Sequence, residues 1–145
     1  MPSEAHLLLL ARAVLAELPP GWRARRCRRR WGADFGGSGH CWFPTKVISV
    51  PWPPTHVETI AVIAHEVAHA LLHEHETRDH VREYEAESWA FRWMRSRGLR
   101  IPRDHVDGAR WNVRAAIVAD IKAGNKIRSS IRRWAYRKTR EDVTC

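Results

Sequence analysis

An apolar segment over residues 57–72 constrains the fold of this chain more than any other part of the sequence. A capping box, Thr55 followed by Glu58, stands just before it and predicts that a helix begins at 55. The segment also carries His65, Glu66 and His69. They directly follow the apolar run TIAVIA, which should be buried, so these polar side chains are expected inside the protein. The apolar residues recur at three- and four-residue spacing, which predicts a helix to about His73: Val57, Ile60, Ala61, Ala64, Ala68, Leu71 and Leu72.

His65, Glu66 and His69 form the pattern H-E-x-x-H. On a helix, the four-residue spacing puts both imidazoles on one face, roughly 6 Å apart at Cβ, within reach of a single Zn²⁺. Glu66 then stands beside the metal and can hold a water molecule. The alternative is a polar helix face with solvated histidines, which does not explain the buried apolar run before His65. We therefore predict one zinc ion per chain.

A third protein ligand is needed, and the nearby histidines do not fit. On a continuous helix, a rise of about 1.5 Å per residue carries His73 about 12 Å and His75 about 15 Å from His65. Bonds of about 2.0–2.1 Å do not span such distances. His75 falls at the third-ligand position of the metzincin pattern, but that pattern requires a glycine where this chain has Leu72. Both histidines are therefore rejected as ligands.

The segment REYEAESWAFRWM, residues 82–94, offers a better third ligand. Glu83 and Glu87 lie four residues apart, and two alanines on the same side allow this helix to pack closely on the first. Glu83 would complete a His₂Glu set with a fourth position left for water, which is typical of catalytic zinc. Glu87 would accept the hydrogen bond that orients a ligand histidine. Glu85 or Glu87 as the ligand remain alternatives.

The order of the remaining segments predicts a single α+β domain over residues 1–145. We expect a small sheet of about three strands, packed on the H-E-x-x-H helix and on three to four further helices. The expected helices are 3–18 with Ser3 as its cap, 81–97, 103–123 and 125–138, and the expected extended segments are 22–30 and 40–50, with 45–50 as the clearest strand.

Positive charge is concentrated near the two ends of the chain, whose formal net charge is +9. Segments 21–31 and 126–140 hold six arginines and seven Lys or Arg, respectively. Such segments, with tryptophans among them, can bind nucleic acid, or they can serve only as solvated surface. The candidate nucleic-acid-binding residues are Arg25, Arg26, Arg28, Arg29, Arg30, Arg132, Arg133 and Arg137.

The three cysteines, an odd number without regular spacing, do not favour a disulfide scaffold. Cys27 and Cys41 flank a glycine-rich stretch and could face each other across a hairpin. No stretch approaches the roughly 20 apolar residues of a membrane span. The first apolar run follows Glu4 and no basic residue, unlike a signal peptide. We predict a cytoplasmic protein without membrane contact, and the sequence carries no signal for an oligomeric state.

The segments TIAVIAHEVAHALLH and EYEAESWAFRWM resemble the zinc metallopeptidase domains of the ImmA/IrrE family. They are also similar to the peptidase-like domain of ArdC-type antirestriction proteins. In that family a helix with E-x-x-A-(N/D/E)-x-x-A supplies the glutamate ligand. The resemblance covers about residues 45–95. It implies a zincin-like fold, gluzincin-like peptidase activity, His65, His69 and Glu83 as metal ligands, and Glu66 as the catalytic base.

Three functions are compatible with these patterns. The first is a zinc endopeptidase that hydrolyses a specific protein substrate, such as a DNA-bound regulator in a bacterial or mobile-element context. The second is a nucleic-acid-binding or antirestriction module that keeps a zincin scaffold. The third is a small regulatory partner of toxin–antitoxin type. For the peptidase, we expect strand 45–50 at a sheet edge, where it pairs with the substrate backbone. Tyr84, His80 or an arginine would stabilise the oxyanion.

Overall fold

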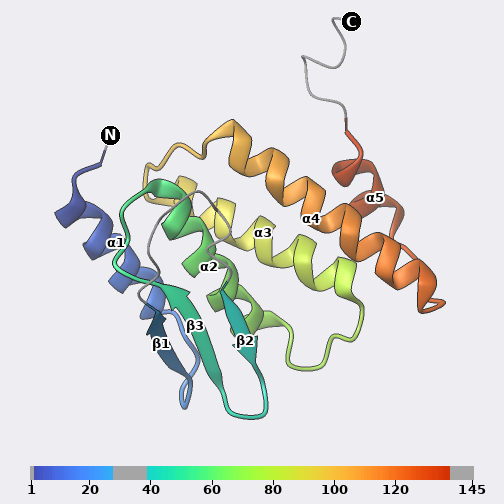
Figure 1. The fold of residues 1–145 in the computed structure, drawn as a ribbon, viewed down its shortest axis with the longest axis horizontal. Coiled ribbons are helices and arrows are strands. Elements are labelled where there is room, and N and C mark those ends of the chain that lie inside the picture. Colours follow the sequence, from blue (N-terminus) through green and yellow to red (C-terminus); the bar gives the residue numbers. More distant parts are fainter. Residues whose placement is uncertain (1, 28–38, 138–145) are drawn as a thin grey trace, which may run out of the picture.

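A computed structural model describes residues 2–27 and 39–137 of the chain (Figure 1). Within these ranges the protein is a small α+β domain with five helices and a three-stranded mixed sheet. The predicted residues Arg28, Arg29 and Arg30 lie outside the described residues. The elements are α1 (Glu4–Leu15), β1 (Arg23–Cys27), β2 (His40–Trp42), β3 (Val47–Pro51), α2 (Val57–Leu72), α3 (Asp79–Ser96), α4 (Arg103–Lys122) and α5 (Ser129–Ala135).

The sheet has the order β1-β3-β2, which corrects the expectation that the strand near 45–50 is an edge. β3 is central: β1 pairs with it in parallel and β2 pairs with it antiparallel. Four of its five residues are buried, whereas β1 and β2 have no buried residue. An apolar strand buried in this way is typical of a sheet centre. In the described part of the chain, β2 is an outer strand that contacts α2.

The same strand order corrects the expected pairing of the cysteines. Cys27 on β1 lies opposite Pro51 of β3, and Cys41 on β2 lies opposite Ile48 of β3. Because β3 separates the two outer strands, Cys27 and Cys41 do not face each other across a hairpin. Both are free thiols.

Of the two helix caps predicted from the sequence, the one at Ser3 is confirmed and the one at Thr55 is wrong. Ser3 caps α1, and its Oγ accepts a hydrogen bond from the backbone N–H of His6 (3.2 Å). The capping box at Thr55 is not formed, because α2 begins at Val57 with His56 as its cap residue. The hydroxyl of Thr55 instead bonds the ring Nδ1 of His56 (2.9 Å). The helix expected over 125–138 is also shorter, since residues 125–128 form no helical turn.

Two apolar cores stand on either side of the polar part of the α2–α3 contact. The larger core joins α1, β3, α2 and the C-terminal half of α3, with Ile48, Ile60 and Met94 fully buried. The smaller core joins the start of α3 to α4 and α5, through residues that include Val81 and Ile117. In Figure 1, the sheet, α2, α3 and α4 follow one another across the molecule. None of the helices in the described ranges has both the length and the apolar character that a membrane crossing requires.

Candidate metal centre

The C-terminal half of α2 and the N-terminal half of α3 bring two imidazoles and one carboxylate together. The Nε2 atoms of His65 and His69 lie 2.9 Å apart. Glu83 reaches both of them, with Oε2 at 3.3 Å from His65 Nε2 and Oε1 at 3.3 Å from His69 Nε2. The helical period places the two histidines on the same face of α2, and the close packing of α3 brings Glu83 opposite them.

The spacing of these donor atoms suits a tetrahedral zinc site. With bonds of about 2.0–2.1 Å, tetrahedral geometry sets two ligand atoms roughly 3.3 Å apart. Each imidazole Nε2 lies at about this distance from an oxygen of Glu83, His65 from Oε2 and His69 from Oε1, and the two nitrogens are closer together, at 2.9 Å. His65, His69 and Glu83 are also the group of possible metal-binding side chains that converges in the described part of the chain. Two imidazoles and one carboxylate are a donor set that zinc accepts.

The other two glutamates of α3 contact different histidines. Glu87 is buried, and its Oε1 lies 3.1 Å from the Nδ1 of His65, on the side of the ring away from Glu83. The pair is a close charge contact rather than a well-aligned hydrogen bond. Glu85 lies 3.3 Å from the Nε2 of His73. Of the three candidates, Glu83 is therefore the one that faces the Nε2 atoms of both His65 and His69.

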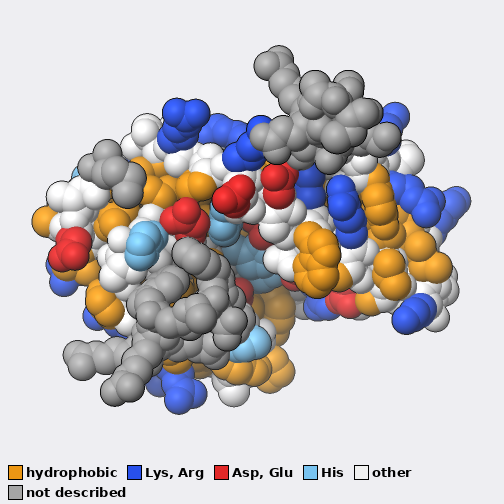
Figure 2. Space-filling view, turned by 45° about the horizontal axis from the view of Figure 1, so that its top comes forward, with side chains coloured by type: hydrophobic (Ala, Val, Ile, Leu, Met, Phe, Trp, Pro, Cys, Tyr) orange, Lys and Arg blue, Asp and Glu red, His pale blue; other side chains and the backbone are white. Residues whose placement is uncertain are grey.

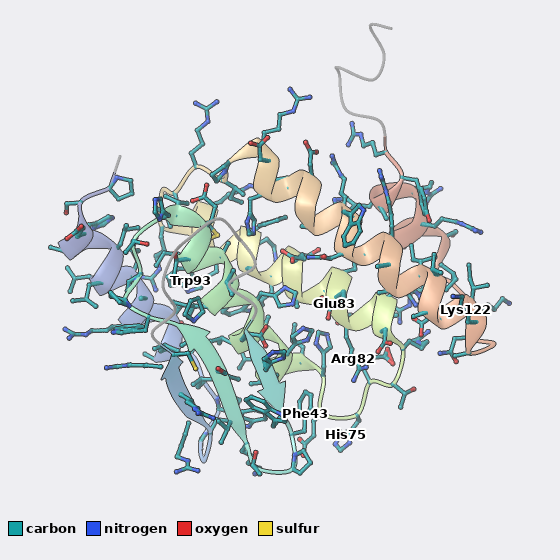
Figure 3. The ribbon with its side chains drawn as sticks, viewed as in Figure 1. Phe43, His75, Arg82, Glu83, Trp93 and Lys122 are labelled. Carbon is teal, nitrogen blue, oxygen red and sulfur yellow. The ribbon has the colours of Figure 1, made fainter. Side chains whose placement is uncertain are left out.

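The two histidines that the sequence argued against as ligands lie in different environments. His75 is on the loop after α2, and 90% of its side chain is exposed (Figure 3). His73 is buried at the end of α2, and its Nδ1 lies 2.9 Å from the Nδ1 of His69. His73 therefore contacts the Nδ1 side of the His69 ring and does not reach the point where the Nε2 atoms converge.

The carboxylates around His65 favour positive charge at this point. Burial lowers the pKa of His65, but Glu87 and Glu83 outweigh burial and raise the pKa well above its ordinary value. Burial raises the pKa of Glu83, but the contacts with His65 and His69 lower it by more, so the net shift is downward. Burial lowers the pKa of both His69 and His73. Two imidazole lone pairs beside the carboxylates of Glu83 and Glu87 attract a cation, either a proton or a metal ion.

Glu66 lines the same pocket as His69 and Glu83, on the side where Gly39 precedes β2. Only 6% of this residue is exposed. Burial, opposed by His65 and aided by Glu83 and Glu87, raises the pKa of its carboxyl to about 7. Gly39 packs directly against it: a Cβ at position 39 would lie 2.3 Å from the Cγ of Glu66. The chain thus requires a glycine here so that the backbone can approach the Glu66 side chain.

An open pocket of about 220 Å³ lies between β2 and the two helices. Figure 2 shows histidine and acidic side chains gathered around a hollow on this face of the molecule. Figure 3 shows Glu83 and Arg82 on α3, with Phe43 following β2. The lining residues come from both sides of the pocket: Gly39, His40, Cys41, Phe43, Glu66, His69, Arg82 and Glu83.

Sequence reasoning missed the β2 side of this pocket and did not single out Arg82. The four glycines within residues 32–40 were a usable signal for Gly39, because glycine marks close backbone approach. For Arg82, the one sequence feature that could have indicated a place at the site is its position next to Glu83. Its guanidinium also forms an ion pair with Asp79.

Two of the expected oxyanion-stabilising residues lie elsewhere, which corrects that expectation. His80 is completely buried and bonds Asp120 of α4. Tyr84 packs edge-on against Trp134 of α5, with ring centroids 5.3 Å apart. Neither side chain lines the pocket. Because α3 turns by about 100° per residue, these positions face α4 and α5 rather than α2.

The described arginines of the two basic segments are exposed but far apart. Arg25 and Arg26 are on β1, and Arg26 lies over the ring of Trp52 at 4.3 Å. Arg132, Arg133 and Arg137 belong to α5 or follow it directly. Figure 1 shows β1 and α5 at opposite sides of the molecule. The described parts of the two segments therefore do not form one continuous basic surface.

Comparisons of this chain with protein-family models, with curated proteins and with solved structures found no match.

Proposed function

We propose that this protein is a zinc metallopeptidase that cleaves a specific protein substrate, with His65, His69 and Glu83 as the metal ligands. The observation that supports this proposal is the convergence of two Nε2 atoms and one carboxylate, close enough to hold one metal ion, beside the buried Glu66 and an open pocket. A zincin-like fold of the ImmA/IrrE type remains part of the proposal, on the strength of the motif resemblance and the neighbouring α2 and α3.

The chemistry would come from the bound ion and from Glu66 together. When bound, zinc lowers the pKa of a coordinated water molecule and polarises a peptide carbonyl. Glu66 takes the proton of the attacking water and passes it to the leaving amine. A carboxyl with a pKa raised towards 7 by burial can both accept and donate a proton near neutral pH.

The pocket offers a place for an extended peptide. β2 is an outer strand in the described part of the chain, and its residues His40 and Cys41 line the pocket next to Glu66. An edge strand presents free backbone N–H and C=O groups, which pair with a substrate backbone. We therefore assign substrate alignment to β2, not to the strand near 45–50 that the sequence indicated.

Arg82 supplies the positive charge at the rim of the pocket. Arg82 directly precedes Glu83 near the N-terminal end of α3, and its side chain lines the pocket. One third of the side chain is exposed, and Asp79 holds the guanidinium from one side. We assign Arg82 to stabilising negative charge on the substrate carbonyl oxygen during cleavage.

The replacement Glu66→Gln tests the proposal. We expect about one zinc per chain in both proteins, and a rate of cleavage about 10²–10⁴ times lower in the variant, because a general base is lost. The measurement is zinc content together with hydrolysis of a mixture of fluorogenic peptides. Glu74→Gln is the matched control, since it removes the same charge from a residue whose side chain is 66% exposed.

Two results would count against the proposal. Unchanged cleavage in Glu66→Gln would show that Glu66 is not the base. Cleavage by the wild type that does not depend on added zinc, after treatment with a chelator, would remove the metal from the reaction.

A second candidate function is nucleic-acid binding on the same scaffold, with the arginines of β1 and α5 as contacts. Their exposure supports it, and their separation limits each surface to few phosphates. Such a module would lose affinity steeply as salt rises. Absence of retention on DNA at low salt would remove this candidate, and the peptidase proposal does not depend on the result.

A further inference from the structure

His73 lies behind the His69 ring and links it to a carboxylate on the next helix. It is 1% exposed, and its Nδ1 is 2.9 Å from the Nδ1 of His69. Its other ring nitrogen, Nε2, is 3.3 Å from Oε2 of Glu85. The three side chains form a continuous row from the centre of the α2–α3 contact to its edge.

The outer end of this row determines where the protons lie. An ionised carboxylate only accepts hydrogen bonds, so the Nε2 of His73 must carry hydrogen and donate to Glu85. A neutral imidazole has one donor and one acceptor, so the Nδ1 of His73 then accepts. The Nδ1 of His69 must therefore donate, which leaves the lone pair of His69 on Nε2, the atom that faces His65 and Glu83.

We propose that His73 is a positioning residue that, together with Glu85, fixes the tautomer and the ring orientation of His69 for metal binding. The inference rests on the proposed zinc site and adds residues that the metal does not touch. Metal-binding histidines generally donate their second ring N–H to a fixed acceptor. In this chain His65 has Glu87 beside its Nδ1, whereas His69 has a histidine backed by a glutamate.

Arg128 forms the outermost contact of the row. Its guanidinium lies 3.8 Å from Oε1 of Glu85, and about half of its side chain is exposed. An exposed contact of this length contributes little by itself. Arg128→Ala should therefore change zinc affinity far less than changes at His73.

The test compares His73→Leu with His73→Asn. Asparagine keeps a polar acceptor close to the position of the imidazole Nδ1, and leucine does not. We expect zinc affinity, measured by competition with a chelator, to fall about 10–100-fold in His73→Leu and to be largely retained in His73→Asn. His75→Leu is the matched control, because that histidine is exposed and should leave the affinity unchanged.

A second readout does not require metal. Nitrogen-15 spectra of the imidazoles should show the wild-type His69 with hydrogen on Nδ1 only. His73→Leu should give a mixture of both tautomers. Glu85→Gln, at a partly exposed position, should also give a mixture, because a glutamine amide can donate to His73 and reverse the direction of the row.

The outcomes separate this inference from the proposed function. If the wild type binds no zinc while the tautomers behave as stated, the metal site fails and the row stands as a structural feature. If the wild type binds zinc and His73→Leu binds it equally well with an unchanged His69 tautomer, the positioning role is overturned. If His73→Leu does not fold, Glu85→Gln decides by the same two measurements.

Discussion

The buried histidines of this protein have two different kinds of surroundings. His69 is on α2 and His73 caps the C-terminal end of that helix, whereas His80 is on α3; all three are less than 9% exposed. The polar atoms of His80 all have hydrogen-bonding partners within the protein. The groups around His69 leave two Nε2 atoms facing each other and a carboxylate.

His80 acts as a structural crosslink. Its backbone N–H donates to Oδ2 of Asp120 (2.8 Å), and its ring Nδ1 contacts the same oxygen. Its Nε2 accepts a hydrogen bond from the backbone N–H of Arg128 (3.2 Å). The start of α3, the end of α4 and the start of α5 are thereby tied together. Each polar atom of the ring has a protein partner, so no ligand is needed.

The cluster on α2 differs because its ring atoms converge instead of pairing outward. His65 and His69 both have a protein group behind Nδ1, and both direct Nε2 to the same point. Burial alone therefore does not distinguish a ligand histidine from a structural one. The direction of the free ring nitrogens does, and the following predictions test that distinction.

The largest effect in these tests should come from Gly39→Ala, on the side of the His65, His69 and Glu83 cluster. The added Cβ would overlap the buried Glu66 side chain from its Cγ outward, so the Glu66 carboxylate would be displaced. A displacement of about 1 Å can reduce a catalytic rate about 100-fold, so we expect cleavage to fall towards that extent while the fold and zinc content are kept. Peptide hydrolysis and metal analysis measure both.

Gly108→Ala is the matched control for that change. Gly108 lies within α4, and a Cβ there meets no atom within 4 Å. Alanine is favoured over glycine in a helix by roughly 1 kcal/mol. The variant should be slightly more stable and cleave at the wild-type rate. Equal losses of activity in both variants would contradict the specific role of the Gly39–Glu66 contact.

A smaller effect, on stability alone, is expected from Asp120→Asn on the side of His80. Burial raises the pKa of Asp120, but hydrogen bonds from His80, Asn125 and Asp79 outweigh it and lower the pKa to about 2, from an ordinary value of 3.8. This difference corresponds to roughly 2 kcal/mol of stability with the carboxylate ionised.

The pH dependence follows from the sign of that shift. Because the folded pKa is depressed, the contribution of Asp120 is present above about pH 4 and is lost as the pH falls towards 2. The difference in free energy of unfolding between wild type and Asp120→Asn should shrink over the same range. Zinc affinity should not change. A large loss of zinc affinity in this variant would mean that the two histidine groups are not independent.

Much of the helical structure could be predicted from the sequence, because helix signals are local. Apolar periodicity located α2, and Ser3 marked the start of α1 correctly. The four-residue spacing of His65 and His69 also predicted that both lie on one helix face, and the same spacing of Glu83 and Glu87 suggested that the next helix faces them. The Thr55 cap was wrong because a neighbouring imidazole competes for the hydroxyl, and sequence spacing does not reveal such a competition.

The features that depend on contacts between distant segments could not be predicted in this way. The order of the strands depends on which strand is buried in the core, and here it is β3, which packs on α2. The partner of His80 is 40 residues away on α4. The contacts of His73 with His69 and Glu85 were not predicted, because the distance of His73 from His65 excluded it as a ligand, although its four-residue spacing from His69 was visible.

The most direct measurement is the zinc content of the purified wild type beside Glu83→Ala and His75→Ala, after dialysis against zinc and then against buffer. The account predicts about one zinc in the wild type and in His75→Ala, and almost none in Glu83→Ala. A Glu83→Ala protein that keeps its zinc as tightly as the wild type would contradict the assignment of the α2–α3 cluster as the metal centre.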